Sequence, residues 1–382
     1  MLFGEDPQRV DATARADATA VVNSHNGWAP LEEVIVGAPF HLDYQNDVSF
    51  RVFFFGNLRS GLNPNGRGPW VISADSELEK RVRAELEEDL AEFISLLERE
   101  DVAVRRPEIP SAAQEFRTPD WTSSSGHSVM PRDMLLVIGN EVIETAPMVR
   151  SRYLESNLYK RLLVEYFNRG AKWTVAPRSR LLEENFDFGY VRGEGYDDPL
   201  PEEPFYEIMF DGAQVLRLGR DLLFNCSTEN HRMGMRWLQR QLGDDYRVHE
   251  INITDHHADA RMLPLRPGTL LLHREIEEHL LPPFLRDWEI VRYAPPEEDL
   301  EPGTYGGRPI LASPGLGMNV LSLDEERVVV QDSQAALIRD LDKAGFSPIP
   351  CSWRHGRIVG GGFHCMTLDV RRRGGLEDYF SG

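Results

Sequence analysis

The stretch Val359-Gly-Gly-Gly-Phe-His-Cys-Met-Thr-Leu-Asp-Val370 sets Cys365 directly after three glycines and Phe363-His364, and directly before an apolar run. Glycine adopts positive φ and lets the backbone approach another group closely. Such a loop can present the cysteine at the mouth of a pocket, near the end of a strand. Two interpretations are open: a nucleophilic thiolate, or an ordinary turn followed by a buried cysteine, since free cysteine is among the most buried residue types.

Short apolar runs paired by turns alternate with single helices along the rest of the chain. Leu31-Glu-Glu-Val-Ile-Val-Gly37 predicts a strand, and Ser76-x-x-Glu79 predicts the capped start of an amphipathic helix that ends near Glu100. Strand pairs are predicted within 134–145, 214–225 and 318–331, and helices at about 151–170, 233–242 and 333–344. This alternation predicts one α+β domain built from repeated hairpin-plus-helix units.

The predicted domain spans residues 22–382, and residues 1–21, which are polar and rich in Ala and Asp, are predicted to form a flexible N-terminal tail. The segment from Phe40 to Ile72 is aromatic, rich in Asn and Gly, and aperiodic. Because it is long for a bare loop, we expect a functional lid or an irregular wall there.

Composition excludes several classes of function. The net charge of −20 disfavours nucleic acid as a partner, because proteins that bind a phosphate backbone present a basic surface. No apolar run is long enough to span a membrane, and Met1 to Ala20 lacks the apolar core of a signal peptide. The three cysteines form no close pair, which argues against a disulfide framework and for a reducing, cytoplasmic location.

Three places besides the Cys365 loop carry acidic residues at expected strand ends. Asp133 and Asp211 each precede a predicted strand, and Asp255-His-His-Ala-Asp259 combines two acids with histidines. If this last segment is extended, Asp255, His257 and Asp259 share one face.

These residue types fit chemistry at a guanidinium carbon. A cysteine nucleophile needs a proton donor for its leaving group, and histidine is the usual one. Carboxylates accept the N–H groups of a planar guanidinium in pairs. Cys365, His257 and the strand-end Asp residues together supply both functions.

Structural interpretations remain open for several of these residues. Asp133 and Asp211 could simply cap turns. A zinc site at His256-His257 is disfavoured, because neighbours on a strand point apart and no third His or Cys lies at ligand spacing. Packing roles are predicted for His364, Cys226 and Cys351, and solvent exposure for Arg371-Arg-Arg373.

Sequence stretches over about Val22 to Tyr379 match one known family. They are Asn26-Gly-Trp-Ala-Pro-Leu-Glu-Glu-Val-Ile-Val-Gly37, Thr118-Pro-Asp-Trp121, Met130-Pro-Arg-Asp133, Gly170-Ala-Lys-Trp173, Phe210-Asp211, Leu216-Arg-Leu-Gly-Arg-Asp221, Gly317-Met-Asn-Val320 and Gly360-Gly-Gly-Phe-His-Cys365. In these stretches the chain resembles the amidinotransferases, which include glycine amidinotransferase of creatine synthesis and the inosamine-phosphate enzyme of streptomycin-type pathways.

The resemblance implies the pentein fold, a five-bladed α/β propeller of ββαβ units, and it implies a role for each matching residue. By this resemblance, Cys365 matches the family's nucleophile, His257 its catalytic histidine, and Asp211 the acid that partners that histidine. The implied substrate-binding residues are Asp133 and Asp259 for the guanidinium, Ser313 beside the substrate, and Arg274 for the donor's carboxylate.

The implied reaction is a ping-pong transfer of the amidino group of L-arginine, or another guanidino donor, through an amidino-cysteine to an amine acceptor. It needs no metal and no cofactor, and its partners are small molecules. The resemblance also favours a homodimer, and with the Arg-rich composition it favours a bacterial enzyme of specialised, antibiotic-type metabolism. Arg274 lies two residues earlier than the family's arginine. Either Arg274 takes over from a shifted loop, or the donor's carboxylate is held otherwise, or the donor is not arginine.

Two alternatives to amidino transfer remain. In the first, water replaces the amine and the protein is a guanidino-hydrolase of the arginine deiminase or dihydrolase type. In the second, the protein is a binding module on the same fold, which the presence of all five central residues disfavours. The departures Gln214 and His256 from the glycine enzyme predict an acceptor larger than glycine.

Overall fold

The computed structural model describes residues 20–40, 76–112, 114–125, 129–182, 207–254, 257–299, 303–305, 308–310 and 315–380. Several predictions therefore lie outside the described residues. They concern the tail before Ala20, the expected lid after Phe40, the pair Asp255-His256, and Ser313.

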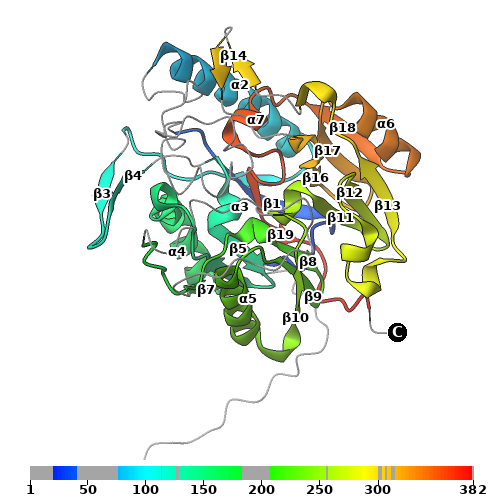
Figure 1. The fold of residues 1–382 in the computed structure, drawn as a ribbon, viewed down its shortest axis with the longest axis horizontal. Helices are drawn as coiled ribbons and strands as arrows, with labels where there is room; N and C mark the ends of the chain where they lie inside the picture. The colour runs from blue at the N-terminus through cyan, green and yellow to red at the C-terminus, as the bar shows by residue number, and fades with distance from the viewer. Residues whose placement is uncertain are drawn as a thin grey trace, which may run out of the picture.

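Five three-stranded sheets among the described residues follow one plan: an antiparallel pair, then a third strand parallel to the middle one (Figure 1). The sheets are β5–β6–β7 (Leu135–Ile138, Glu141–Glu144, Lys172–Val175), β8–β9–β10 (Val215–Leu218, Asp221–Asn225, Arg247–Ile251), β11–β12–β13 (Met262–Arg266, Thr269–His273, Glu289–Tyr293), β16–β17–β18 (Leu321–Ser322, Arg327–Gln331, Ser347–Cys351) and β19–β1–β2 (Thr367–Arg372, Leu31–Val36, Ala103–Arg105).

Parallel neighbours need a crossover connection, which is usually helical. In four of these sheets it contains an α-helix, and these helices lie toward the outside of the molecule (Figure 1). They are α2 (Glu77–Arg99), α4 (Lys160–Asn168), α5 (Glu229–Leu242) and α6 (Ala335–Lys343). Between β12 and β13 the short 3-10 turns Glu278–Leu280 and Pro283–Leu285 replace the helix. The predicted repetition of ββαβ units is confirmed.

Shorter elements complete the chain. The hairpins are β3–β4 (Glu115–Arg117, Thr122–Ser124) and β14–β15 (Gly303–Tyr305, Arg308–Ile310), and the short helices are α3 (Pro131–Met134) and α7 (Gly356–Val359). The last described strand, β19, pairs with the first, β1, so strands from opposite parts of the chain share one sheet.

Helix α2 packs against the loop that carries Cys365. The predicted cap forms, because Ser76 Oγ accepts a hydrogen bond from the backbone N–H of Glu79 at 3.1 Å. The apolar face of α2 is buried, and the ring of Phe93 packs against Phe363 with centroids 4.9 Å apart. Phe363 lies two residues before Cys365, so this packing supports the loop that carries the cysteine.

The predicted helix over 151–170 is wrong in its first half. The 3-10 turns Arg150–Arg152 and Glu155–Tyr159 precede α4, which begins only at Lys160. Buried charged contacts compete with regular helix here, because Arg152 and Glu155 are both almost fully buried and form an ion pair at 2.7 Å. In contrast, α5 begins earlier than predicted, at Glu229, because Thr228 caps it.

A buried ion cluster joins β19 to two other parts of the chain. Asp369 in β19 accepts hydrogen bonds from Arg132 at 2.5 Å, from Arg217 at 2.7 Å and from Arg372 at 2.7 Å. Burial alone would raise the pKa of Asp369, but the three guanidinium groups hold it well below its ordinary value. The prediction that residues 371–373 are solvated is therefore wrong for Arg372, which is 1% exposed because side chains alternate along β19.

Asp369→Asn is expected to lower the free energy of unfolding by about 3 to 5 kcal/mol, because it leaves three buried guanidinium groups without their shared counter-charge. Denaturant unfolding followed by circular dichroism measures the change. Asp287→Asn, at an exposed aspartate, is the matched control. A loss for Asp369→Asn no larger than that of the control would contradict a stabilising role for the cluster.

Among the described helices, none combines the length and the apolar character that a bilayer crossing requires. The longest, α2, carries charged residues along its whole exposed face.

Candidate active site

Cys365 lies in the turn between α7 and β19 and is 2% exposed. Gly360 ends α7 with a φ of +76°, in the left-handed region that glycine adopts without strain. A Cβ atom on Gly361 would lie 2.6 Å from Met130 Cε and 2.8 Å from Cys365 Cβ, so a larger residue would displace the cysteine or its neighbour. The glycines therefore let the loop pack directly on the residue that precedes α3.

Asn319 holds the backbone of this loop. Its Oδ1 accepts hydrogen bonds from the N–H groups of Gly362 at 3.0 Å and Cys365 at 2.9 Å. Its Nδ2 donates to the backbone carbonyl of Asp259 at 3.2 Å. Asn319 belongs to one of the stretches that match the family, but its role was missed, because nothing in the chain order shows which amide will meet the loop.

Asp259 is the carboxylate nearest to the thiol. Its Oδ2 lies 3.2 Å from Cys365 Sγ and 2.7 Å from His364 Nδ1. Burial, and then the negative charge of Asp259, raise the pKa of the Cys365 thiol well above its ordinary value. The thiol is therefore protonated in the free protein at neutral pH.

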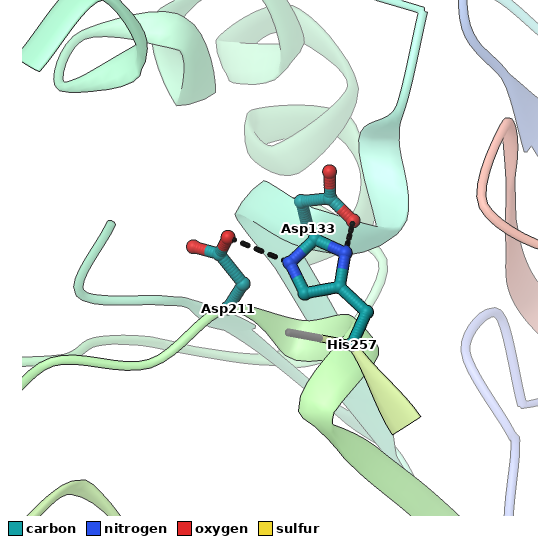
Figure 2. A group of neighbouring side chains, drawn as sticks. All are labelled: Asp133, Asp211 and His257. Atoms are coloured by element: carbon teal, nitrogen blue, oxygen red, sulfur yellow. Dashed lines mark hydrogen bonds and ion pairs between the residues drawn. The ribbon is translucent and has the colours of Figure 1, made fainter. Parts of the chain in front are cut away.

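His257 lies between two carboxylates, with one ring nitrogen facing each (Figure 2). Its Nε2 is 3.0 Å from Asp211 Oδ2, and its Nδ1 is 3.4 Å from Asp133 Oδ1. Burial alone would lower the pKa of His257, but Asp133, Asp211 and Asp259 outweigh it and raise that pKa to about 9. His257 is therefore a buried imidazolium at neutral pH.

Two local structures position these acids. Asp133 lies in α3, and Arg152 donates to its Oδ2 at 2.5 Å. Asp211 precedes the 3-10 turn Gly212–Gln214, where Gln214 Oε1 accepts from the backbone N–H of Asp211 at 2.9 Å. Gln214 is fully buried and also donates to a backbone carbonyl, so it supports the turn from inside the protein.

Three carboxylate oxygens of this site accept no hydrogen bond from the described residues. They are Oδ1 of Asp133, Oδ1 of Asp211 and Oδ1 of Asp259, all fully buried. Among these residues, the first of them forms only the 3.4 Å ion pair with His257 Nδ1. Buried polar atoms are almost always hydrogen-bonded, because leaving them without a donor is costly. Three such oxygens, together with one thiol and one imidazolium, have the chemistry that suits a ligand rich in N–H donors.

Five of the seven predicted site residues thus form one buried group: Cys365, His257, Asp211, Asp133 and Asp259. Arg274 is exposed at the end of β12, and no hydrogen bond or ion pair links its side chain to another described residue. Ser313 lies outside the described residues.

The expected strand geometry at His257 and Asp259 is wrong. His257 has extended backbone angles, but Asp259 belongs to the 3-10 turn Ala258–Ala260. Their side chains are therefore positioned by that turn and not by alternation along a strand.

The donor atoms of Asp133, Asp211 and His257 lie within 4.8 Å of one another, a spacing that a metal ion could bridge. The imidazole itself, however, lies between the two carboxylates where such an ion would sit. A bound metal would also require a neutral histidine, whereas the two acids favour the protonated ring. The charge in this cluster fits a proton better than a metal.

Five sheets of this common plan, four of them with a crossover helix, are typical of a class of proteins, the penteins. DDAH from Pseudomonas aeruginosa has this fold and aligns with a TM-score of 0.54 over 89% of this chain and 99% of its own, at 15% identity. That similarity shows the shared fold and confirms the predicted α+β propeller.

Within the penteins, the chain belongs to the amidinotransferase family. It is 37% identical to the L-arginine:L-lysine amidinotransferase of Pseudomonas savastanoi pv. phaseolicola, over 94% of this chain and 97% of that protein. It is 39% identical to inosamine-phosphate amidinotransferase 1 of Streptomyces griseus, over 92% and 97%. A solved amidinotransferase of the saxitoxin pathway from Microseira wollei aligns with a TM-score of 0.78 at 36% identity, over 94% and 99%. No family profile matches the chain. The protein is therefore a transferase of amidino groups, as the sequence predicted.

Proposed function

We propose that this protein transfers the amidino group of L-arginine, or another guanidino donor, to an amine through an amidino intermediate on Cys365. The buried Oδ1 atoms of Asp133, Asp211 and Asp259 carry this proposal, because none of them accepts a hydrogen bond from the described residues. Asp133 Oδ1 forms only the longer 3.4 Å ion pair with His257. A guanidinium offers five or more N–H donors in one plane, and carboxylates bind it through short, charge-assisted hydrogen bonds. The guanidinium N–H groups would then donate to these oxygens, with the guanidinium carbon facing Cys365.

In the first half-reaction the bound cation lowers the pKa of the Cys365 thiol, and the thiol proton is released to solvent. The thiolate attacks the guanidinium carbon and forms a C–S bond. The C–N bond to the donor's amine then breaks, and the imidazolium of His257 gives its proton to that amine. A raised His257 pKa of about 9 supports this acid role, because the proton is present at neutral pH.

In the second half-reaction an acceptor amine replaces the departed one. The nitrogen of the incoming amine attacks the amidino carbon. His257, now neutral, accepts a proton from that amine during the attack. The C–S bond breaks and the thiolate returns. Asp211, at 3.0 Å from Nε2, stabilises the imidazolium that forms again.

The acceptor is proposed to be a primary amine of a biosynthetic pathway, because the similar proteins are named for lysine, inosamine phosphate and saxitoxin. Gln214 gives no information about the acceptor, since its side chain is fully buried under Asp211. We keep Ser313 and Arg274 as proposed substrate contacts, Arg274 for a carboxylate of the donor.

Two further expectations accompany this proposal. Cys226, Cys351 and Cys365 are all free, and a thiol nucleophile works in a reducing compartment, which supports the cytoplasm of a bacterial cell. The homodimer implied by the family resemblance stays a prediction.

The proposal is tested with guanidino-labelled L-arginine and no acceptor. We expect the label on the Cys365 peptide in a mass spectrum after acid quenching, and its loss from that peptide when amines are added. A panel of lysine, glycine, inosamine phosphates and larger diamines then identifies the acceptor as the compound that carries the label.

Two results would contradict amidino transfer. If no guanidino donor labels Cys365, the proposed covalent intermediate is contradicted. Release of ammonia and citrulline at a rate independent of amine would instead establish the hydrolase alternative.

A further inference from the structure

The two oxygens of Asp259 face different partners. Oδ2 contacts both the Nδ1 atom of His364 and the thiol of Cys365, whereas Oδ1 has no hydrogen-bond donor among the described residues. A carboxylate oxygen accepts about two hydrogen bonds, so Oδ2 is fully used. In this orientation of the carboxylate, Oδ1 is therefore the oxygen that can accept a hydrogen bond from a substrate.

His364 is itself fixed and uncharged. Arg132 Nε donates to the backbone carbonyl of His364 at 2.7 Å, and the residue is 8% exposed. Burial, and then the charge of Arg132, lower the pKa of His364 to about 4. A neutral ring that faces a carboxylate must carry its proton on the nitrogen nearest to it, so Nδ1–H donates to Asp259 Oδ2.

The hydrogen bond from His364 gains importance when the thiolate forms. The thiol donates to Oδ2 at 3.2 Å, but a thiolate at that distance has no proton to donate and repels the carboxylate. His364 is then the remaining described donor to Oδ2. Burial alone would raise the pKa of Asp259, but this hydrogen bond, with the charges of His257 and Arg132, holds it below its ordinary value.

We propose that His364 is a positioning residue for amidino transfer: its Nδ1–H holds Asp259 in the orientation that presents Oδ1 to the guanidinium while the Cys365 thiolate forms. This inference rests on the proposed function of Cys365. It also revises the prediction that His364 merely packs beside the nucleophile, because the ring is hydrogen-bonded to an acid of the site.

Three substitutions of His364 separate hydrogen bonding from packing. The side-chain nitrogen of Asn lies where Nδ1 of histidine lies, and that of Gln lies closer to Nε2. His364→Asn can therefore keep the bond to Asp259, whereas His364→Gln keeps polarity and bulk but displaces the donor. His364→Leu removes the donor altogether.

The rate of amidino-adduct formation from donor alone is the measurement, taken over a range of donor concentrations by rapid quench and mass spectrometry. We expect His364→Gln and His364→Leu to lower the second-order rate constant about 10- to 100-fold, the usual worth of a hydrogen bond to a charged group. His364→Asn is expected to stay within about threefold of the wild type. Thermal unfolding of each variant checks the fold.

The outcomes distinguish this inference from the function on which it rests. Equal losses in the Asn and Gln variants, or no loss in the Leu variant, would overturn the role of His364 and leave Cys365 as the nucleophile. An adduct that still forms in Cys365→Ala would overturn the proposed function itself. If the Leu variant does not fold, the Asn and Gln pair still decides the question.

Discussion

Cys365→Ala is expected to abolish the labelled adduct and to lower amidino transfer by about 10⁴-fold or more, as loss of a covalent nucleophile does in other enzymes. No other cysteine is expected to take over, because neither Cys226 nor Cys351 lies beside the acids of the site. The charges that act most strongly on these two thiols are those of Glu250 and Glu92 respectively. Steady-state transfer from labelled arginine to the identified acceptor measures the effect.

Cys351→Ala and Cys226→Ala are the matched controls, since both remove a free, buried thiol of the same size. Each is expected to keep the wild-type turnover, apart from a modest loss of stability from the small cavity. Cys365→Ser adds a check on folding, because a hydroxyl can donate to Asp259 in place of the thiol. Transfer in Cys365→Ala within tenfold of the wild type would exclude the covalent pathway.

His257→Gln is expected to lower turnover by about 10²- to 10⁴-fold, the range for loss of a general acid–base. The glutamine side chain keeps a donor near Asp211 but cannot release a proton. The loss is therefore expected to be smallest for a guanidino donor whose leaving amine has a low pKa, such as canavanine, because that amine needs no protonation. A uniform loss for both donors would argue that His257 only supports the fold.

The pH dependence of the second half-reaction gives an independent check on His257. There His257 must be neutral to accept a proton, so the rate with acceptor is expected to rise with pH through the pKa of His257, which its acids raise to about 9. Asp211→Asn removes one of these acids and should move that rise to lower pH. The pre-formed amidino-enzyme, mixed with acceptor at each pH, provides the measurement. An unmoved profile in Asp211→Asn would assign the rise to the amine instead.

Several elements could be predicted because their signals are local. Ser76 and Glu79 specify the start of α2, and the hairpin at Gly139-Asn140 follows from two apolar runs around a turn. The helix expected from residue 151 failed because distant charges compete with it: Arg152 turns to Asp133 and Met130, which lie about twenty residues earlier in the chain.

The candidate site shows the same division. Cys365, His257 and the acids indicated guanidinium chemistry through their residue types alone, and the family resemblance assigned their roles. Arg152, Asn319 and His364 were missed or interpreted as packing residues. Each of the three acts through a contact with a residue far away in the chain. Neither spacing nor periodicity in the sequence therefore reveals its role.

Local sequence determined the repeated ββαβ units, because turns, caps and apolar periodicity depend on residues only a few positions apart. Family-specific stretches determined the class of reaction. Tertiary structure alone decided the charge states: it buried Asp259 beside Cys365, enclosed His257 between Asp133 and Asp211, and set Arg372 on Asp369. Those charge states depend on burial, because electrostatic interactions strengthen steeply when water is excluded. They also depend on distances of a few ångströms between charged groups, and most of these groups lie far apart in the chain.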